Sequence, residues 1–265
     1  MSIQSTLLVD IGNTAIKWCF CLQDEVIAGD LKGELKVSQK IYPTKISSDF
    51  FIELWQQFNT PTNIIVSCVG NDSVLNALQQ AGQKLWSRDV TQMISTQKSY
   101  HFLNAYEEPA QLGDDRFCGM VAAYHHTDAD YMVVDCGSAI TIDIVSKDSS
   151  NVRAHQGGYI FPGLGLMKAS LGQKTANVEV NNTVSPADLL PGNTTEECVN
   201  AAIYLSAITL IERIFRQQEK EGMQCILTGG DAEELAKFLS IKYSLVPDLV
   251  LRGLWYLCHT KKITS

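Results

Sequence analysis

The chain has 265 residues, of which 45% are hydrophobic and 19% are charged, and its formal net charge is −8. This length and composition suffice for one large globular domain or two of moderate size. The acidic balance argues against a nucleic-acid backbone or an anionic membrane as main partner, so an anionic ligand must be met by local cations, backbone N–H groups or a metal ion.

Signals for export or metal binding are few. The first twenty residues include Asp10 and no basic region, so they do not read as a signal peptide, and no apolar stretch approaches the roughly 20 residues of a membrane span. The eight cysteines are scattered and form neither a CxxC motif nor a zinc-type Cys/His quartet. We therefore expect a cytoplasmic protein in a reducing compartment, with no membrane and no nucleic-acid partner.

The predicted elements alternate along the chain. Apolar runs predict β-strands at residues 6–10, 15–22, 63–69, 131–135, 139–146 and 224–228. Helical periodicity predicts α-helices at residues 48–58, 73–83, 116–126, 166–171, 196–219 and 232–239. The longest helix follows Asn193-Thr194-Thr195-Glu196-Glu197, which supplies N-cap residues and a capping-box glutamate. Strands that alternate with helices in both halves predict the α/β class.

Each half opens with a similar phrase. LLVDIGNT at 7–14 and MVVDCGSA at 132–139 both join an apolar run to Asp, one apolar residue, Gly and a small polar residue. One explanation is structural: the Asp-x-Gly pattern makes a hairpin turn in each half. The other is functional: each half places a carboxylate and a tight turn at the end of a strand. The matching contexts favour two similar domains, 1–122 and 123–265, facing each other across a cleft. Glycine lets backbone approach a phosphate, and a carboxylate suits the water shell of an accompanying Mg²⁺.

The first turn has the chemistry of a phosphate site. It comprises Asp10, Ile11, Gly12, Asn13, Thr14, Ala15, Ile16 and Lys17. Its N–H groups and hydroxyl would cradle the β- and γ-phosphates of a nucleotide, with Lys17 returning on the next strand and Asp10 holding a metal ion through water. No Gly-Lys-Ser/Thr opens a helix here, so the motif is not a Walker A loop.

A second cluster of charge begins a predicted helix. Leu112-Gly113-Asp114-Asp115-Arg116 places two adjacent carboxylates and a guanidinium after a glycine. One aspartate could simply cap the helix. The other would act as general base on a substrate hydroxyl, and Arg116 would bind a substrate carboxylate, which fits its planar fork.

Three further motifs are rich in glycine. The second Asp-Gly turn offers the hydroxyls of Ser138 and Thr141 and continues to Asp143. Residues 157–165 are predicted to form a loop that lies against a ligand or a domain partner. Thr228-Gly229-Gly230-Asp231 leads into a helix whose N-terminus suits an anion. Each of these loops alone is more often only a turn. The five histidines form no pattern, and we assign none to catalysis or metal binding.

Together the motifs resemble those of the type III pantothenate kinases, in family order and over essentially the whole chain. Residues 10–17 are similar to the family's D-x-G-N-T-x-x-K, and 106–116 to its Y-x-x-P-x-x-L-G-x-D-R. Residues 135–143 resemble D-x-G-T-A-T-T-x-D, 157–163 resemble G-G-x-I-x-P-G, and 228–230 match the late T-G-G. The resemblance implies the superfamily of sugar kinases, actin and Hsp70-like ATPases, with two RNase-H-like domains around a nucleotide-binding cleft.

The same resemblance implies an enzyme that phosphorylates pantothenate with ATP, the first step of coenzyme A biosynthesis. Asp115 is the implied general base on the 4′-hydroxyl of pantothenate. The implied pantothenate site consists of Tyr106, Gly113, Asp114, Asp115, Arg116 and Thr195. Thr194 is an alternative to Thr195 for the last of these contacts.

Nucleotide, ions and assembly are implied in the same way. The 10–17 turn binds ATP with Mg²⁺, and Ser138 contacts ATP. Asp135 holds the monovalent cation that the family needs, K⁺ or NH₄⁺. Family members are dimers through the second domain, which would make helix 196–219 part of a homodimer interface.

The chain departs from the family pattern at two hydroxyl positions. Ser138 and Ile140 both stand where the family has Thr, from which we expect altered ATP affinity and unchanged chemistry. Two other functions stay open at this point. One is a kinase of the same superfamily acting on another small hydroxylated substrate, and the other is a catalytically idle regulatory or transcription-accessory relative.

Overall fold

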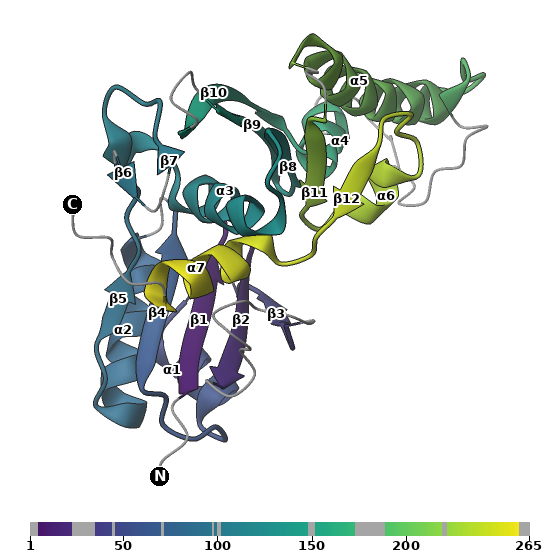
Figure 1. Cartoon of the computed structure of the whole chain (residues 1–265). Helices are drawn as coiled ribbons and strands as arrows, with labels where there is room; N and C mark the ends of the chain where they lie inside the picture. Colours follow the sequence, from purple (N-terminus) through teal and green to yellow (C-terminus); the bar gives the residue numbers. More distant parts are fainter. Residues whose placement is uncertain are drawn as a thin grey trace. The chain divides into compact units, whose positions relative to one another are not determined.

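The structure, a computed structural model, describes residues 5–22, 35–43, 46–69, 72–96, 98–99, 102–147, 152–172, 189–218 and 222–259. The chain divides into two compact units, Met1–His126 with Asp248–Ser265, and Thr127–Pro247. Each unit contains one mixed sheet with helices packed on it (Figure 1). The α/β class predicted from the sequence is therefore confirmed in both units.

The first unit is built on a five-stranded sheet in the order β3-β2-β1-β4-β5. Its strands are β1 (Ser5–Ile11), β2 (Ala15–Leu22), β3 (Ser38–Ile41), β4 (Asn63–Cys68) and β5 (Val90–Gln92). The pairs β1–β2 and β2–β3 are antiparallel, whereas β1–β4 and β4–β5 are parallel. A short antiparallel hairpin, β6 (Lys98–Ser99) with β7 (Phe102–Leu103), follows β5.

Five consecutive strands of the second sheet repeat this plan. They are β8 (Tyr131–Cys136), β9 (Ala139–Lys147), β10 (Arg153–Pro162), β11 (Gln224–Thr228) and β12 (Tyr243–Leu245). They lie in the order β10-β9-β8-β11-β12, with the first two pairs antiparallel and the last two parallel. The duplicated Asp-Gly phrase thus marks a duplicated topology, in which β1 corresponds to β8.

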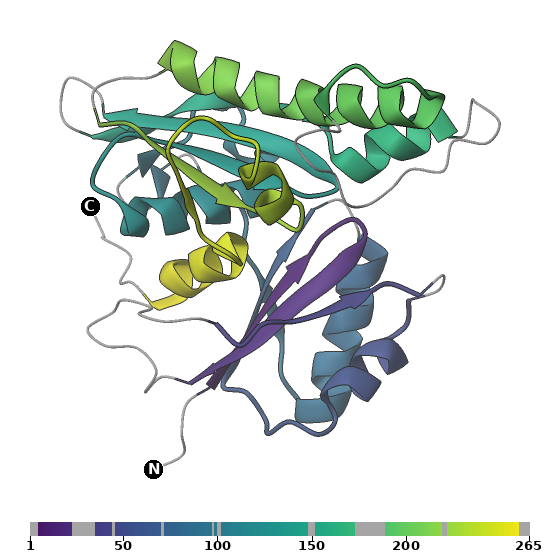
Figure 2. The same cartoon turned by 90° about the vertical axis from the view of Figure 1, so that its right-hand side faces the viewer.

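Helices cover both faces of the first sheet. They are α1 (Ser48–Trp55), α2 (Asp72–Trp86), α3 (Asp114–His126) and α7 (Leu249–His259). Leu7, Val9 and Ile11 on β1 form one buried core with residues of α1 and α2. Because successive side chains of a strand point to opposite faces, Leu8 and Asp10 face the other side, where α3 and α7 lie (Figure 2).

The C-terminal helix α7 belongs to the first unit. Gly253 of α7 lies so close to α3 that a Cβ atom there would overlap the carbonyl oxygen of Cys118. The expectation of a single C-terminal domain over 123–265 differs from this arrangement, because the chain returns to the first unit at Asp248. A glycine is what allows the backbones of α3 and α7 to approach this closely.

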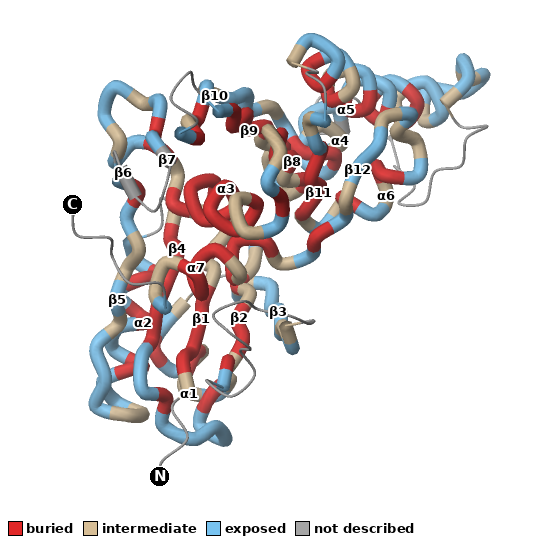
Figure 3. Tube along the Cα trace, viewed as in Figure 1, coloured by how far each residue is buried: buried red, intermediate tan, exposed pale blue. Residues whose placement is uncertain are grey.

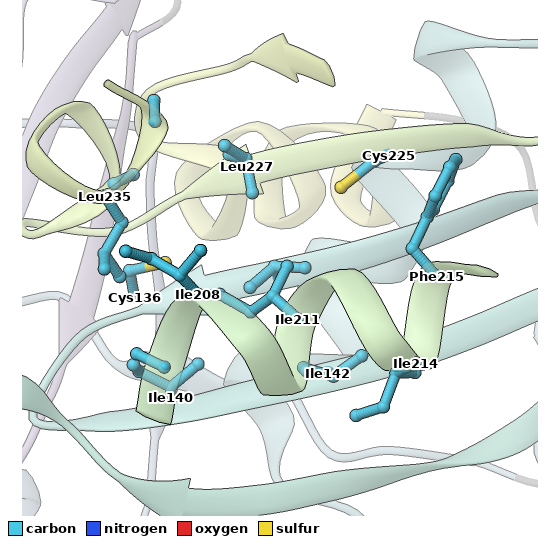
Figure 4. Packing of buried hydrophobic residues seen from close by; sticks show 14 of the residues in the cluster. Cys136, Ile140, Ile142, Ile208, Ile211, Ile214, Phe215, Cys225, Leu227 and Leu235 are labelled. Carbon is cyan, nitrogen blue, oxygen red and sulfur yellow. The ribbon is translucent and has the colours of Figure 1, made fainter. Parts of the chain in front are cut away.

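The core of the second unit lies between its sheet and helix α5. The helices of this unit are α4 (Leu164–Gly172), α5 (Thr195–Gln218) and α6 (Ala232–Ala236). Ile140 and Ile142 of β9 pack with Ile208, Ile211 and Ile214 of α5 (Figure 4). Each fully buried isoleucine contributes about 1.5–3 kcal/mol relative to an exposed one, so the helix is held firmly on the sheet. The predicted end of this helix at residue 219 lies outside the described residues.

Helix α5 is also apolar and long enough, by length and composition alone, to cross a membrane. Its most apolar window has a mean hydropathy of 1.5, which corrects the expectation that no stretch of the chain approaches such a span. Half of that window is buried inside the unit, and core helices pass the same test. The apolar character of α5 is therefore weak evidence for a membrane span.

Strand β10 replaces most of the loop predicted over 157–165. Its pairing with β9 shifts register between His155 and Gly157, which is a β-bulge. Gly157 has a φ of 106°, a conformation that side-chain-bearing residues rarely adopt. These glycines bend a strand instead of ending it.

Candidate active site

The predicted phosphate turn joins β1 to β2. The strands pair Asp10 with Lys17 and Ile11 with Ile16, and the N–H of Gly12 donates to the carbonyl oxygen of Ala15 at 3.1 Å. Asn13 and Thr14 are exposed at the tip. The N–H of Tyr42, just after β3, donates to the carbonyl oxygen of Thr14 at 3.2 Å. The strand–turn–strand expected from the sequence is confirmed, and the turn is tied to the neighbouring strand.

Charged side chains gather on one face of this turn. Asp10 and Lys17, paired directly across two antiparallel strands, share a face of the sheet. The Lys17 ammonium lies 3.9 Å from a carboxylate oxygen of Asp248, immediately before α7. The Lys17 ammonium and the carboxylates of Asp10 and Asp248 therefore lie where β1 ends. A cation beside carboxylates suits a ligand that carries both phosphate and a metal ion.

Asp114 is anchored inside the first unit at the start of α3. It is 8% exposed, and its carboxylate accepts hydrogen bonds from the Ser95 N–H at 3.1 Å and the Gln92 amide at 3.4 Å. The same Gln92 amide reaches the carbonyl oxygen of Cys68, at the end of β4. Burial nevertheless raises the pKa of Asp114 above its ordinary value. This carboxylate ties the ends of β4 and β5 to the first turn of α3.

Asp115 is the more accessible of the two carboxylates. One of its oxygens accepts a hydrogen bond from the N–H of Arg116 at 2.7 Å. A Cβ atom on Gly113 would lie 2.6 Å from that same oxygen, so the glycine leaves room for the carboxylate. The N–H of Phe117 donates to the carbonyl oxygen of Gly113, which begins the helix. The local backbone therefore fixes where the Asp115 carboxylate sits.

The side chains of Arg116 and Tyr106 lie together. The guanidinium of Arg116 donates to the Tyr106 hydroxyl at 2.7 Å, and its central carbon lies 5.6 Å from the centre of the tyrosine ring. Asn104 accepts from the Tyr106 N–H and donates to Ser95 and to the carbonyl of Pro109, which opens the short 3₁₀ helix Pro109–Gln111. One hydrogen-bonded network around the start of α3 therefore joins Ser95, Asn104, Tyr106, Pro109, Asp114 and Arg116.

Several carboxylates of the first unit influence the pKa of the Cys118 thiol. Cys118 lies one turn into α3, a helix that is buried along most of its length (Figure 3). Burial raises the pKa of this thiol well above its usual value, and the negative charges of Asp114, Asp10 and Asp115 raise it further. The phosphate turn and the start of α3 therefore contribute carboxylates to one region of the first unit.

In the second unit two glycine motifs, after β10 and after β11, converge on the turn between β8 and β9. The N–H of Gly163, after β10, donates to the carbonyl of Ser138 at 3.0 Å. The N–H of Asp231, after β11, donates to the carbonyl of Cys136 at 2.9 Å. Gly229 has a φ of 98°, and a Cβ atom there would lie 2.5 Å from a carboxylate oxygen of Asp135. The backbone thus packs around Asp135 as closely as glycine permits.

The head of α5 separates the two candidate threonines. Thr194 is the N-cap, because its hydroxyl accepts from the Glu197 N–H at 3.2 Å while the Glu197 carboxylate accepts from the Thr194 N–H at 3.1 Å. The predicted capping box is confirmed. Thr195 is the first residue of the helix and is exposed. The Thr194 hydroxyl is therefore engaged in the cap, which favours Thr195 for a substrate contact.

The structure also pairs two residues that sequence reasoning left apart. A ring nitrogen of His155 on β10 lies 2.9 Å from a carboxylate oxygen of Asp143 on β9, and both side chains are almost fully buried. Twelve residues separate them in the chain, and only the pairing of β9 with β10 brings them together. A buried, hydrogen-bonded pair of this kind holds the bulged strand in register.

We expect Asp114→Asn to favour the folded state more at neutral pH than at acidic pH. Because the folded-state pKa of Asp114 is raised, its contribution to stability is fully present at acidic pH and falls as the pH rises through the raised pKa. Asparagine does not titrate, so the free energy of unfolding of the variant should rise relative to that of the parent as the pH increases. Urea unfolding of both proteins from acidic to neutral pH tests this. A difference in unfolding free energy that does not change with pH would contradict it.

Gly229→Ala should destabilise the second unit by about 1–3 kcal/mol, because the new methyl group overlaps the Cys136 carbonyl and the Asp135 carboxylate at a positive φ. Gly230→Ala is the matched control, since a Cβ atom at Gly230 has no neighbour within 4 Å, and we expect a change within about 0.5 kcal/mol. Urea denaturation measures both. Equal losses in the two variants would show that the close packing around Asp135 is not what requires Gly229.

Comparisons with known proteins place the chain in a family. Residues 6–217 match the family model of type III pantothenate kinase. A type III pantothenate kinase of Nitrosococcus oceani is 33% identical over 256 residues, which cover 94% of this chain and 91% of that protein. One of Acinetobacter baumannii is 33% identical over 264 residues, which cover 97% and 99% of the two chains.

A solved structure supports the fold independently. A candidate 2-dehydro-3-deoxygalactonokinase of Sinorhizobium meliloti aligns with a TM-score of 0.56 at 12% identity, covering 94% of this chain and 96% of that one. Such a likeness speaks for the fold alone. The family model and the full-length relatives carry the assignment, and from them the chain belongs to the type III pantothenate kinase family.

Proposed function

We propose that this chain transfers the γ-phosphoryl group of ATP to the 4′-hydroxyl of pantothenate, which is the first step of coenzyme A biosynthesis. The observation that carries the proposal is the network at the start of α3. The Asp115 carboxylate accepts a hydrogen bond from the backbone N–H of Arg116, and the Arg116 guanidinium donates to the Tyr106 hydroxyl, so consecutive residues supply a carboxylate and an oriented guanidinium. Pantothenate presents both an alcohol and a carboxylate, so this pair matches the two groups that an enzyme must recognise.

The roles within the first unit follow from this pair. Arg116 binds the substrate carboxylate and Tyr106 fixes the plane of its guanidinium. Asp115 accepts the proton of the hydroxyl as the alcohol oxygen bonds to the γ-phosphorus. The bond between that phosphorus and the bridging oxygen of ADP breaks at the same time, and ADP leaves with the electron pair. Asp114 anchors the first turn of α3 to Ser95, and Gly113 leaves room for the Asp115 carboxylate.

The phosphate turn of residues 10–17 would hold the nucleotide. Its exposed tip offers N–H groups and the Thr14 hydroxyl, and Lys17 offers a cation on the same face as Asp10. Among the described residues no three His, Cys, Asp or Glu side chains form a metal cage. This suits Mg²⁺ bound by Asp10 through water and by the phosphates of ATP. When bound, Mg²⁺ supplies neutralisation of the charge on the transferred group.

We assign Asp135, Ser138 and Thr195 in the second unit to the same reaction. The Asp135 carboxylate, enclosed by backbone that leaves no room for a Cβ atom at Gly229, fits a weakly hydrated monovalent cation such as K⁺ or NH₄⁺. Ser138, exposed on the β8–β9 turn, would contact ATP. Thr195 would reach pantothenate from the head of α5, since Thr194 is engaged as the N-cap.

Assembly and location complete the proposal. Helix α5 exposes Leu205, and the neighbouring helix α4 exposes Leu166 and Leu171, so apolar side chains lie outside the core of the second unit. We propose a homodimer that covers such residues through the second unit. A cytoplasmic location, where ATP and reducing conditions are available, agrees with the scattered cysteines, most of which are buried.

Asp115→Asn tests the proposed base directly. We expect kcat to fall by about 10²–10⁴-fold, because asparagine cannot accept the proton, while ATP affinity changes by no more than about twofold. A coupled assay of ADP formation gives kcat, and calorimetry with ATP and Mg²⁺ gives the affinity. Glu53→Gln, which neutralises an exposed carboxylate on α1, is the matched control and should keep parental activity. Undiminished turnover in Asp115→Asn would refute the assignment of the base.

A further inference from the structure

A buried hydroxyl beside the phosphate turn is not used by the fold. Ser67, the fifth residue of β4, is 0% exposed, and its Oγ has no hydrogen-bond partner among the residues that the structure describes. Buried hydroxyls in native proteins are almost always paired, because an unpaired one has lost water and gained nothing. An isolated hydroxyl inside a strand of apolar residues therefore calls for a functional explanation.

The strand register shows where this hydroxyl belongs. In the parallel pair of β1 and β4, Ser67 is the direct partner of Asp10. Their neighbours Val9 and Val66 lie in the core with α1 and α2, so Asp10 and Ser67 both point to the opposite face. Adjacent strands lie about 4.8 Å apart, which brings a serine hydroxyl within reach of a neighbouring carboxylate by rotation about one bond. Both residues also stand at the carboxyl ends of their strands, beside the phosphate turn.

We propose that Ser67 is a positioning residue of the nucleotide site, whose hydroxyl donates a hydrogen bond to the Asp10 carboxylate when ATP and Mg²⁺ are bound. The inference rests on the proposed function, in which Asp10 meets the metal through water. A carboxylate has about four acceptor positions, and metal-bound waters occupy only those that face the ligand. A donor from the protein side fixes the plane of the carboxylate, as such donors do at other metal sites.

The proposed role of Ser67 predicts different effects of its removal on nucleotide binding and on the stability of the ligand-free protein. If the Ser67 hydroxyl is reserved for the liganded state, its removal takes away an unpaired polar group from the ligand-free protein. Ser67→Ala should then leave the melting temperature of the ligand-free protein unchanged or raise it. Purely structural use of the hydroxyl predicts the opposite, a lower melting temperature without ligand.

The test is calorimetric binding of an ATP analogue whose β,γ-bridging oxygen is replaced by an imido group, with Mg²⁺. We expect Ser67→Ala to bind it about tenfold more weakly than the parent, with an unchanged KM for pantothenate. Ser67→Cys, which keeps the size of the side chain but donates only weakly, should weaken binding in the same direction. Thr6→Val is the matched control, because it removes a buried hydroxyl from the same face of β1, four residues from Asp10, and should leave binding unchanged.

The outcomes are distinct. Weaker binding in both Ser67 variants, with no loss of melting temperature in Ser67→Ala, supports the inference. Parental affinity in either folded Ser67 variant, or an equal loss in Thr6→Val, overturns it while the proposed function stands. If the parent chain itself shows no Mg²⁺-dependent binding of the analogue, the proposed function fails first, and the inference that rests on it falls with it.

Discussion

Concentrated negative charge at one edge of the first sheet is the constraint around which the first unit is arranged. Asp10 near the end of β1 and Asp114 and Asp115 at the start of α3 all raise the pKa of one buried thiol, Cys118. Burial raises the pKa of Asp114 and the charge of Asp115 raises it further, so ionising this buried carboxyl group is costly. The Ser95 N–H and the Gln92 amide hold Asp114 in place, and the part of a bound nucleotide complex that would offset the remaining charge is its divalent cation.

In the second unit the corresponding carboxylate, Asp135, lies against closely packed backbone. The sheet of this unit repeats the five-strand order of the first, so Asp135 on β8 stands where Asp10 stands on β1. A Cβ atom on Gly229 would overlap the Cys136 backbone and lie 2.5 Å from the Asp135 carboxylate. Backbone after β11 therefore packs directly against this carboxylate. Two sheets with the same order of five strands thus carry different chemistry at their strand ends.

Short-range sequence patterns predict many of the strands, turns and caps of this fold. Features that depend on contacts between distant parts of the chain could not be predicted from the sequence. The strands that carry Asp10 and Asp135, the turns after them and the cap of α5 follow from short-range patterns. Strand β10 was missed because the glycines that signal a loop here form a bulge against β9. Helix α7 was not predicted because Gly253 in its middle is unfavourable in a helix, and its role in the close contact with α3 cannot be read from the sequence. No local pattern marks Ser67, whose significance appears only when β4 pairs with β1.

The most direct measurement is ADP release by the purified chain with ATP, Mg²⁺ and K⁺, in the presence and absence of pantothenate, with phosphorylated pantothenate identified by mass spectrometry. The account predicts release that requires pantothenate, yields 4′-phosphopantothenate in equal amount, and falls when Na⁺ replaces K⁺. Release that is indifferent to pantothenate, or no release from a folded sample, would contradict the assignment of Asp115 and Arg116 to an alcohol that carries a carboxylate.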